Sequence, residues 1–586
     1  MKQFFKFVFA SMLAIIILSV LFVLIIVAIA ASSGDKTVYV EPGSILQVSF
    51  NIPVTERTPD DPLARLGITD PKAIGLDDVL ADIAKAKADK HIKGIFLDES
   101  AFTPAQATSE EIRNALIDFK TSGKFVIAYS EIYEQSFYYL ASVADKVYIN
   151  PKGIFLFHGF SQQITFLKGA LDKLGIEAQI IKVGTYKSAV EPFFLTKMSA
   201  ANKLQVNSYL GSMYDHFLTG ISESRHISKD SLFEIADNLK IRFPEDALKY
   251  HLVDGMKYKD EVLDELKQRT GVEYKRDIKT VSLLDYTKAV PETDKKEKNE
   301  SKNQIAVIYA SGDIIGGDGD DNSIGSERVS KALRDARLND NIKAVVFRVN
   351  SPGGSSLASD VIWREVMLTK KAKPIIVSMG DYAASGGYYI SCAADSIFAE
   401  PNTLTGSIGI FAVLPNMQKF FNDKLGITFD GVKTGKYADL GDISRPLTPE
   451  ERNILQSEVD HGYDDFTKAV ASGRHKTQEY INSIGQGRVW TGEQAIKIGL
   501  VDRLGNISDA VKSAAKMAGI KNYTLMPYPE QKSIFSKFGM DMSDQMKVRA
   551  MKSELGENYK YYEQIKGATQ MMRIPQARLP YTISIN

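Results

Sequence analysis

Residues able to support acyl-transfer chemistry gather around two glycine-bearing turns in the second half of the chain. One predicted strand leads into residues 350–354, NSPGG, and the next leads into 379–387, MGDYAASGG. Glycine lets backbone N–H groups approach a ligand without interference from a Cβ atom. Ser385 lies between the second turn and a predicted helix over 388–394, where N–H groups can hold a tetrahedral oxyanion. Ser385 is therefore a candidate nucleophile, although a serine at such a place is more often a helix N-cap.

A serine nucleophile needs a general base, and histidine does not supply one here. The second half of the chain holds only His461 and His475, both outside the glycine-rich turns, and no GxSxG motif occurs. Lysine is the known alternative base. A lysine must be neutral to accept a proton, which requires burial that brings its pKa toward ~7–8.

The chain contains an internal repeat. Residues 138–151, YYLASVADKVYINP, match 388–401, YYISCAADSIFAEP, at an offset of 250. Shorter matches keep the same order and nearly the same offset along both halves. Because chance similarity would not preserve order and spacing, we predict two copies of one domain. We place them at 44–290 and 304–530, joined by a polar linker at 291–303.

The two copies differ in a way that identifies the base. At the same offset Ser385 corresponds to Gln135, so the first copy lacks the nucleophile. Conversely, Lys187 of the first copy corresponds to Ala438 of the second. One copy keeps a base and the other a nucleophile, which indicates an ancestor that paired serine and lysine across a subunit interface. A solvated surface position is the ordinary alternative for Lys187, but its apolar neighbours favour partial burial.

The second copy alternates strand and helix patterns. Short β-branched runs predict strands, and apolar residues at helical spacing predict the helices between them. The predicted strands are 305–309, 344–349 and 374–378, and the predicted helices are 327–337, 356–368 and 450–472. This alternation predicts an α/β fold with parallel strands, in which sites lie at the carboxyl ends of the strands.

Composition narrows the classes of function. Lys+Arg and Asp+Glu both total 72, so the formal net charge is zero, which argues against nucleic-acid binding. Cys392 is the only cysteine, so no intrachain disulfide can form, and we expect a packed core thiol. No histidines or cysteines have metal-ligand spacing, and the acidic loop 316–321 departs from the EF-hand pattern. We therefore expect no metal site.

The N-terminal segment has the length of a membrane span. Residues 8–31 are nearly all apolar, and a helix rising ~1.5 Å per residue would cross the ~30 Å hydrocarbon core. Lys2 and Lys6 precede this stretch, which favours an N-terminus in the cytoplasm and a body outside it. A cleaved signal peptide is the alternative, but its apolar region would be only ~7–15 residues. We predict a cytoplasmic stub and transmembrane anchor at 1–34, and a helical tail at 531–586.

Four motifs together resemble one known family. They are GTYKSAVEPF at 184–193, NSPGG at 350–354, ASGGYY at 384–389 and TGSIG at 405–409. In combination they resemble the bacterial signal peptide peptidase A (SppA) family, in its long, duplicated, membrane-anchored form. The resemblance covers nearly the whole chain, but it says little about the residues after 531.

The resemblance implies an α/β fold of two tandem Clp-protease/crotonase-like domains after one N-terminal transmembrane helix. It implies a homotetramer on the outer face of the bacterial cytoplasmic (inner) membrane. The activity would be that of a serine endopeptidase, without cofactor, that degrades remnant signal peptides after signal peptidase releases them. The site residues carried over by position are Ser385 as nucleophile, Lys187 as general base and then acid, Ser407 as the group that orients the lysine, and Gly353, Gly354 and Gly386 around the oxyanion hole.

Two other functions fit parts of the same pattern. A crotonase-like acyl-CoA enzyme shares the oxyanion turns, but it would need neither Ser385 nor Lys187, and CoA is not expected outside the cytoplasm. A non-catalytic membrane scaffold would retain the fold. The complementary retention of a serine in one copy and a lysine in the other argues against a scaffold, because drift would not preserve one working pair.

Overall fold

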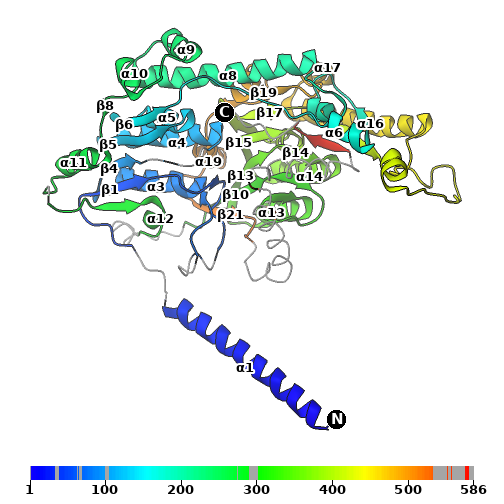
Figure 1. Ribbon diagram of the computed structural model, residues 1–586, viewed down its shortest axis with the longest axis horizontal. Coiled ribbons are helices and arrows are strands. Elements are labelled where there is room, and N and C mark those ends of the chain that lie inside the picture. The colour runs from blue at the N-terminus through cyan, green and yellow to red at the C-terminus, as the bar shows by residue number, and fades with distance from the viewer. Residues whose placement is uncertain are drawn as a thin grey trace.

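The body of the protein is built from two sheet-centred halves that lie side by side (Figure 1). The computed structural model describes residues 2–32, 38–61, 64, 69–98, 100, 104–273, 275–289, 301–531, 551, 556 and 575–579. In Figure 1 helix α1 (Lys2–Ser32) stands apart from this body. Within the part of the chain that the structure describes, no helix is both long and apolar enough to cross a membrane.

The first half contains a six-stranded sheet in which every neighbouring pair is parallel. Its strands, in spatial order, are β8 (Gly255–Met256), β6 (Lys146–Phe155), β5 (Phe125–Tyr133), β4 (Ile92–Leu97), β1 (Ser44–Val48) and β9 (Thr280–Ser282). The helices that pack its larger core include α3 (Leu76–Ala88), α4 (Gln106–Lys120) and α5 (Gln135–Ala141). Parallel strands of this kind are buried on both faces, which explains their continuous apolar runs.

The second half repeats this plan. Its main sheet has the order β19 (Val489–Thr491), β17 (Leu404–Gly406), β15 (Ile375–Ala384), β13 (Ile342–Ser351), β10 (Gln304–Ser311) and β21 (Thr524–Tyr528). Short strands β16 (Ser396–Ala399) and β20 (Arg503–Leu504) branch from β15. The three predicted strands and three predicted helices of this copy are confirmed, the helices as α13 (Ser326–Leu338), α14 (Ser356–Ala372) and α16 (Pro449–Arg474). All pairs are parallel except β17 with β19.

The side chains of the apolar strands in the second half pack into two cores, one on each face of the sheet. Along β10, Ala306 and Ile308 join the core beneath α13 and α14, whereas Ile305 and Val307 face α19 (Ile507–Met517). Successive side chains of a strand point to opposite faces, so an uninterrupted apolar strand supplies both layers. The carboxyl ends of β13 and β15 lead into the two glycine-bearing segments, at Gly353 and at Gly386.

A third sheet joins the two halves and borders the site. Its order is β12 (Ser323–Gly325), β11 (Asp313–Ile315), β14 (Gly353–Ser355), β22 (Gln576–Arg578), β18 (Phe411–Asn416) and β7 (Glu177–Lys182). Strand β7 comes from the first copy and pairs antiparallel with β18 of the second over six register positions. A strand of the first copy therefore belongs to a sheet of the second copy, and the two copies do not form separate bodies.

Two predicted segments fall largely on residues that the structure does not describe. The linker predicted at 291–303 lies outside the described residues except for 301–303. Most of the helical tail predicted at 531–586 lies outside them as well. Within the tail, residues 575–579 are described, and there the prediction of helix is wrong, since Gln576–Arg578 form strand β22.

Candidate active site

Lys187 reaches the second copy because β7 carries the chain across to it. After β7 the chain turns at Gly184, whose φ is 105°, and the N–H of Tyr186 donates to the carbonyl of Gln486 at 2.8 Å. A Cβ atom on Gly487 would lie only 2.6 Å from the backbone nitrogen of Lys187. Glycine at 487 thus allows the loop after α17 (Gln478–Ile484) to close directly over the lysine backbone.

Ser385 sits at the junction of β15 and helix α15 (Gly386–Ser391) in a strained conformation. Its φ is 55° and its ψ −114°, a backbone state that costs a non-glycine residue on the order of 1–3 kcal/mol. The backbone holds it there, because its N–H donates to the Gly406 carbonyl at 2.7 Å and its own carbonyl accepts from Tyr389 N–H at 2.8 Å. The Ser385 hydroxyl makes no capping bond to α15, so it is not an ordinary N-cap.

The structure brings Lys187, Ser385 and Ser407 together, and all three are completely buried. Lys187 Nζ lies 2.8 Å from Ser385 Oγ, 3.1 Å from Ser407 Oγ and 3.2 Å from the Ser407 carbonyl oxygen. Ser407 has a φ of 50° and is fixed by donation of its N–H to the Arg488 carbonyl at 2.7 Å. Sequence separation between the serine and the lysine is 198 residues, so only tertiary structure could bring them into contact.

The surroundings of Lys187 favour its neutral form. Burial lowers the pKa of its ammonium well below the ordinary lysine value. The Phe411 ring centroid lies 5.8 Å from Nζ, and no carboxylate among the described residues pairs with it. Glu191, the nearest acid in sequence, instead accepts hydrogen bonds from Ser199 and Asn202 at the start of helix α8 (Ala200–Arg225). A neutral amine beside a hydroxyl is the arrangement that a general base requires.

The two glycine turns meet beside Ser385. The Gly353 N–H is already used, since it donates to Ser351 Oγ at 3.1 Å. Gly354 instead faces Ala577 of β22 across the antiparallel pair. A Cβ atom on Gly386 would lie 3.2 Å from Gly354 N and 3.0 Å from the Ala577 carbonyl oxygen. Because its N–H donates to Ser351, Gly353 is the weakest candidate donor among the three glycines predicted to line an oxyanion hole.

The corresponding position in the first copy is closed. Gln135 stands where the repeat places the nucleophile. Its side-chain oxygen accepts from the N–H groups of His158 and Gly159 at 3.1 and 3.0 Å, and its amide donates to the Gly159 carbonyl at 3.0 Å. The glutamine side chain thus links α5 to the loop that corresponds to the Ser407 loop of the second copy. Of the serine and lysine pair, the first copy holds only the lysine.

Other sequence candidates do not join this site. Cys392 is buried in the core, its thiol donates to the Tyr389 carbonyl at 3.2 Å, and burial raises its pKa to about 12. His461 lies exposed on α16 beside Asp465. Among the described residues, no group of His, Cys, Asp or Glu is arranged to hold a metal ion.

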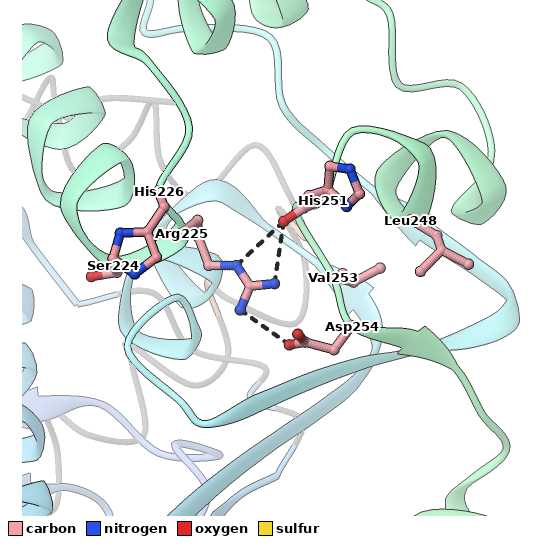
Figure 2. Close-up of a pocket in the computed structure, with 7 residues that line it drawn as sticks. All are labelled: Ser224, Arg225, His226, Leu248, His251, Val253 and Asp254. Atoms are coloured by element: carbon pink, nitrogen blue, oxygen red, sulfur yellow. Dashed lines mark hydrogen bonds and ion pairs between the residues drawn. The ribbon is translucent and has the colours of Figure 1, made fainter.

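A separate pocket of about 350 Å³ opens at the C-terminal end of α8 (Figure 2). Arg225 spans it, pairing with Asp254 at 3.0 Å and donating to the His251 carbonyl at 3.2 and 3.4 Å. The second copy repeats this contact, with Arg474 pairing with Asp502 and donating to the Gly499 carbonyl at 3.2 Å. Because the arginine–aspartate contact recurs in both copies, it is part of the domain framework.

Sequence reasoning missed two contributors to the site. Gly487 crowds the lysine backbone, and strand β22 lies in the glycine cradle nearly two hundred residues after the nucleophile. No motif marks either of them. The lone sequence signal for Gly487 is that it stands in a QGR loop before a short strand. Many surface loops have this feature, so it does not distinguish the position.

A strained serine beside a buried lysine and a pair of N–H donors defines the class of protein as a serine hydrolase. The family follows from comparison with known proteins: residues 118–273 and 367–521 both match the model of Peptidase family S49. The chain belongs to this family, as a serine protease with a mixed α/β fold and two tandem S49 domains.

Relatives cover most of the chain. Protease 4 of Salmonella typhi is 39% identical over 82% of this chain and 77% of its own length. Protease 4 of Haemophilus influenzae is 38% identical over 86% of this chain and 84% of its own length. The chloroplastic serine protease SPPA of Arabidopsis thaliana is 34% identical over 76% of this chain and 66% of its own length. Each alignment is long enough to include residues from both copies.

Proposed function

We propose that this protein is a membrane-anchored endopeptidase with a Ser-Lys dyad that degrades remnant signal peptides. The observation that carries the dyad is the 2.8 Å approach of Lys187 Nζ to Ser385 Oγ in a fully buried setting. Family membership makes the chain a serine protease, which removes the acyl-CoA enzyme and the inert scaffold as alternatives. The Clp-protease/crotonase type of each domain and the homotetramer stay part of this proposal.

The mechanism follows from the positions of four groups. Neutral Lys187 takes the hydroxyl proton of Ser385, and Oγ attacks the carbonyl carbon of the scissile peptide bond. The N–H groups of Gly354 and Gly386 stabilise the oxyanion. Lys187, now an ammonium that donates to the Ser407 hydroxyl and carbonyl, protonates the leaving amine. Water then hydrolyses the ester, with Lys187 acting again as base.

The substrate class is argued from the shape of the site and from the N-terminal helix. Strand β14 pairs with the extended strand β22, so an unfolded segment that replaced β22 would bind as a strand of the same sheet. Large apolar side chains of α1, among them Phe4, Phe7 and Phe9, are exposed to solvent and suit insertion in a bilayer. A peptidase tethered in this way would meet apolar peptides left in the same membrane.

The dyad is tested with the body lacking residues 1–33 and an apolar, signal-peptide-like peptide as substrate. Ser385→Ala and Lys187→Ala should each lower kcat/KM by about 10³-fold or more while far-UV circular dichroism stays unchanged. Ser391→Ala, in the same helix as the nucleophile, and Lys182→Ala, on β7, serve as matched controls that keep activity.

Two results would contradict this proposal. If the wild-type body is active and either dyad variant keeps that activity, the mechanism is wrong. If the wild type cuts no apolar peptide but cleaves soluble unfolded proteins, the substrate class is wrong. The anchor has its own readout: the full chain should sediment with membranes, and the body lacking residues 1–33 should not.

A further inference from the structure

A buried glutamine of the first copy joins the turn that carries the lysine to a strand of the second copy. Helix α8 runs across both halves of the body (Figure 1), and Gln205, in its second turn, is fully buried. The Gln205 side-chain amide donates to the Tyr186 carbonyl at 3.0 Å and to Ser188 Oγ at 2.6 Å, on either side of Lys187. Its side-chain oxygen accepts from the N–H of Val489, the first residue of β19, at 3.3 Å. One side chain thus bonds to both segments.

The partners of Gln205 determine which way its amide points. A backbone N–H can only donate and a backbone carbonyl can only accept, so Oε1 must face Val489 and Nε2 must face Tyr186. A reversed amide would place two donors together at one end and two acceptors at the other. Asn202, three residues earlier on the same face of α8, accepts from Nε2 through its Oδ1 at 3.1 Å. The glutamine is therefore also supported from within its own helix.

The segment that Gln205 contacts in the second copy also holds Ser407. The carbonyl of Arg488, directly before Val489, accepts from the Ser407 N–H at 2.7 Å. On the other side of the glutamine, the lysine turn supplies Lys187, whose Nζ lies 3.1 Å from Ser407 Oγ. Gln205 therefore joins the backbone segments that position the two partners of this contact.

Two charged side chains border the network. Glu191 accepts from the Asn202 side-chain amide at 2.9 Å. The Arg488 guanidinium lies over the Tyr186 ring, 5.2 Å from its centroid. Burial alone lowers the pKa of Lys187, so the place of the amine in its apolar setting decides its charge state, and a neighbouring charge does not. A shift of Nζ toward water would therefore raise this pKa.

We propose that Gln205 is a positioning residue for catalysis: its side-chain amide holds the lysine turn against β19 and thereby sets the approach of Lys187 Nζ to Ser385 and Ser407. The proposal rests on the proposed Ser-Lys dyad. Gln205 acts through the backbone on either side of the lysine, since that is where its hydrogen bonds go. The amine lies at the end of a flexible side chain, and ~1 Å of displacement at a reacting group can cost about 10²-fold in rate.

Steady-state kinetics of the full chain on the apolar peptide, measured across pH, test this role. Gln205→Met keeps the length of the side chain and removes its hydrogen bonds. It should lower kcat at neutral pH by about tenfold or more and change KM by less than about threefold, because the lost geometry matters in the transition state. The acid limb of kcat/KM should move to higher pH, since a displaced Nζ is better hydrated. A residue that only stabilised the fold would lower Tm and leave the acid limb in place.

A second glutamine provides the matched control. Gln494 also joins β19 to α8, since its side-chain oxygen accepts from the Thr491 N–H at 3.2 Å and its amide donates to the Ser208 carbonyl at 3.1 Å. These bonds lie away from the lysine turn. Gln494→Met should therefore lower Tm but keep the wild-type kcat and the wild-type acid limb.

Ser188→Ala is a second test of the same contact. It removes the hydroxyl that accepts from Gln205 and donates to the Tyr186 carbonyl at 2.9 Å. This variant should also move the acid limb to higher pH. The loss of kcat in the double variant with Gln205→Met should be smaller than the product of the two single losses, because both changes disturb one contact. Far-UV circular dichroism and Tm establish that each variant folds.

The outcomes separate this inference from the proposed function. If Gln205→Met keeps the wild-type acid limb, as Gln494→Met should, the positioning role is wrong and the dyad stands. Independent losses of kcat in the Gln205 and Ser188 variants would contradict it as well. If Gln205→Met does not fold, Ser188→Ala decides alone, and an unmoved acid limb overturns the proposal. If the wild type itself cuts no apolar peptide or shows no acid limb, the proposed function fails and the positioning role fails with it.

Discussion

At the scale of single residues, the proposed chemistry depends on the environment of Lys187, beside which the described residues place no carboxylate. Lys187 is buried among apolar groups with two serine oxygens and the Ser407 carbonyl within 3.2 Å of Nζ. A carboxylate at this place would hold the ammonium charged and prevent it from acting as base. The nearest sequence candidate, Glu191, is instead consumed in capping α8. A neutral Lys187 therefore requires that the Glu191 carboxylate be held away from it by its own hydrogen bonds.

The first prediction concerns pH. Because burial lowers the pKa of Lys187, and only the neutral amine accepts a proton, kcat/KM should rise with pH and level off above the folded-state pKa. Below that pKa the activity should fall about tenfold per pH unit. The measurement is the pH profile of kcat/KM on the apolar peptide, and a flat acid limb would exclude Lys187 as the base.

The first prediction extends to stability, since the free energy of unfolding should follow the same titration. Between the folded-state pKa and the ordinary lysine value, the unfolded chain binds more protons than the folded one, so the free energy of unfolding rises with pH. Lys187→Met has no such group and should lose that part of the slope. A wild type and a Lys187→Met variant with identical pH dependence of Tm would show that the lysine is not desolvated.

At the scale of elements, the site is an assembly of segments that approach one another through glycine. Strand β7 and the turn after it position the lysine, the end of β15 positions the serine, and the loop before β19 lies against the lysine backbone. A side chain at Gly487 would collide with the backbone of Lys187. Backbone atoms cannot move aside as the end of a flexible side chain could, so the collision would displace the loop or the lysine. The tightness of this contact decides where Nζ lies relative to Ser385 Oγ.

The second prediction separates that contact from backbone strain. Gly487→Ala places a Cβ atom 2.6 Å from Lys187 N and should lower kcat/KM by tenfold or more, since ~1 Å of displacement can cost about 10²-fold. Gly426→Ala is the control: its φ of 67° resembles the 78° of Gly487, but nothing lies within 4 Å of the added atom. Equal activity in the two variants would show that strain alone matters. Tm should fall further in Gly487→Ala, because the collision adds to the backbone strain that the two variants share.

At the scale of the whole molecule, the two copies behave as one folding unit. Arg348 on β13 of the second copy is buried against Glu56 and Glu111 of the first, at 2.8 and 2.6 Å. Helix α8 of the first copy also bonds to β19 of the second, Ser212 Oγ to Thr491 Oγ1 at 2.9 Å. This buried cluster of one arginine and two carboxylates helps to fix the orientation of the two halves, and hence of Lys187 relative to Ser385.

The third prediction tests that interface. Arg348→Met leaves two buried carboxylates without their counter-ion, which typically costs about 3–5 kcal/mol. Because a folding unit of this size has a large entropy of unfolding, Tm should fall by about 2–4 °C. Arg334→Met removes a pair with Glu365 whose arginine is half exposed, so it should cost only about 0–1 kcal/mol. If the two variants have the same Tm, the buried ion pairs at the interface contribute no more to stability than a surface pair does.

The sequence by itself determined the elements and the candidates for chemistry. Local apolar periodicity placed β10, β13, β15 and the helices between them, since these patterns depend on neighbours along the chain. The internal repeat identified Ser385 and Lys187, because each copy had kept what the other had lost. Both inferences require only short-range patterns and a comparison of the chain with itself.

Only the tertiary structure decided how those residues work. The depth of Lys187 and the strained backbone of Ser385 depend on contacts between segments far apart in sequence. The same is true of β22, a strand that no local pattern indicated, because its partners are the open edges of β14 and β18. Desolvation and strand pairing are properties of the assembled surface, so no single segment encodes them.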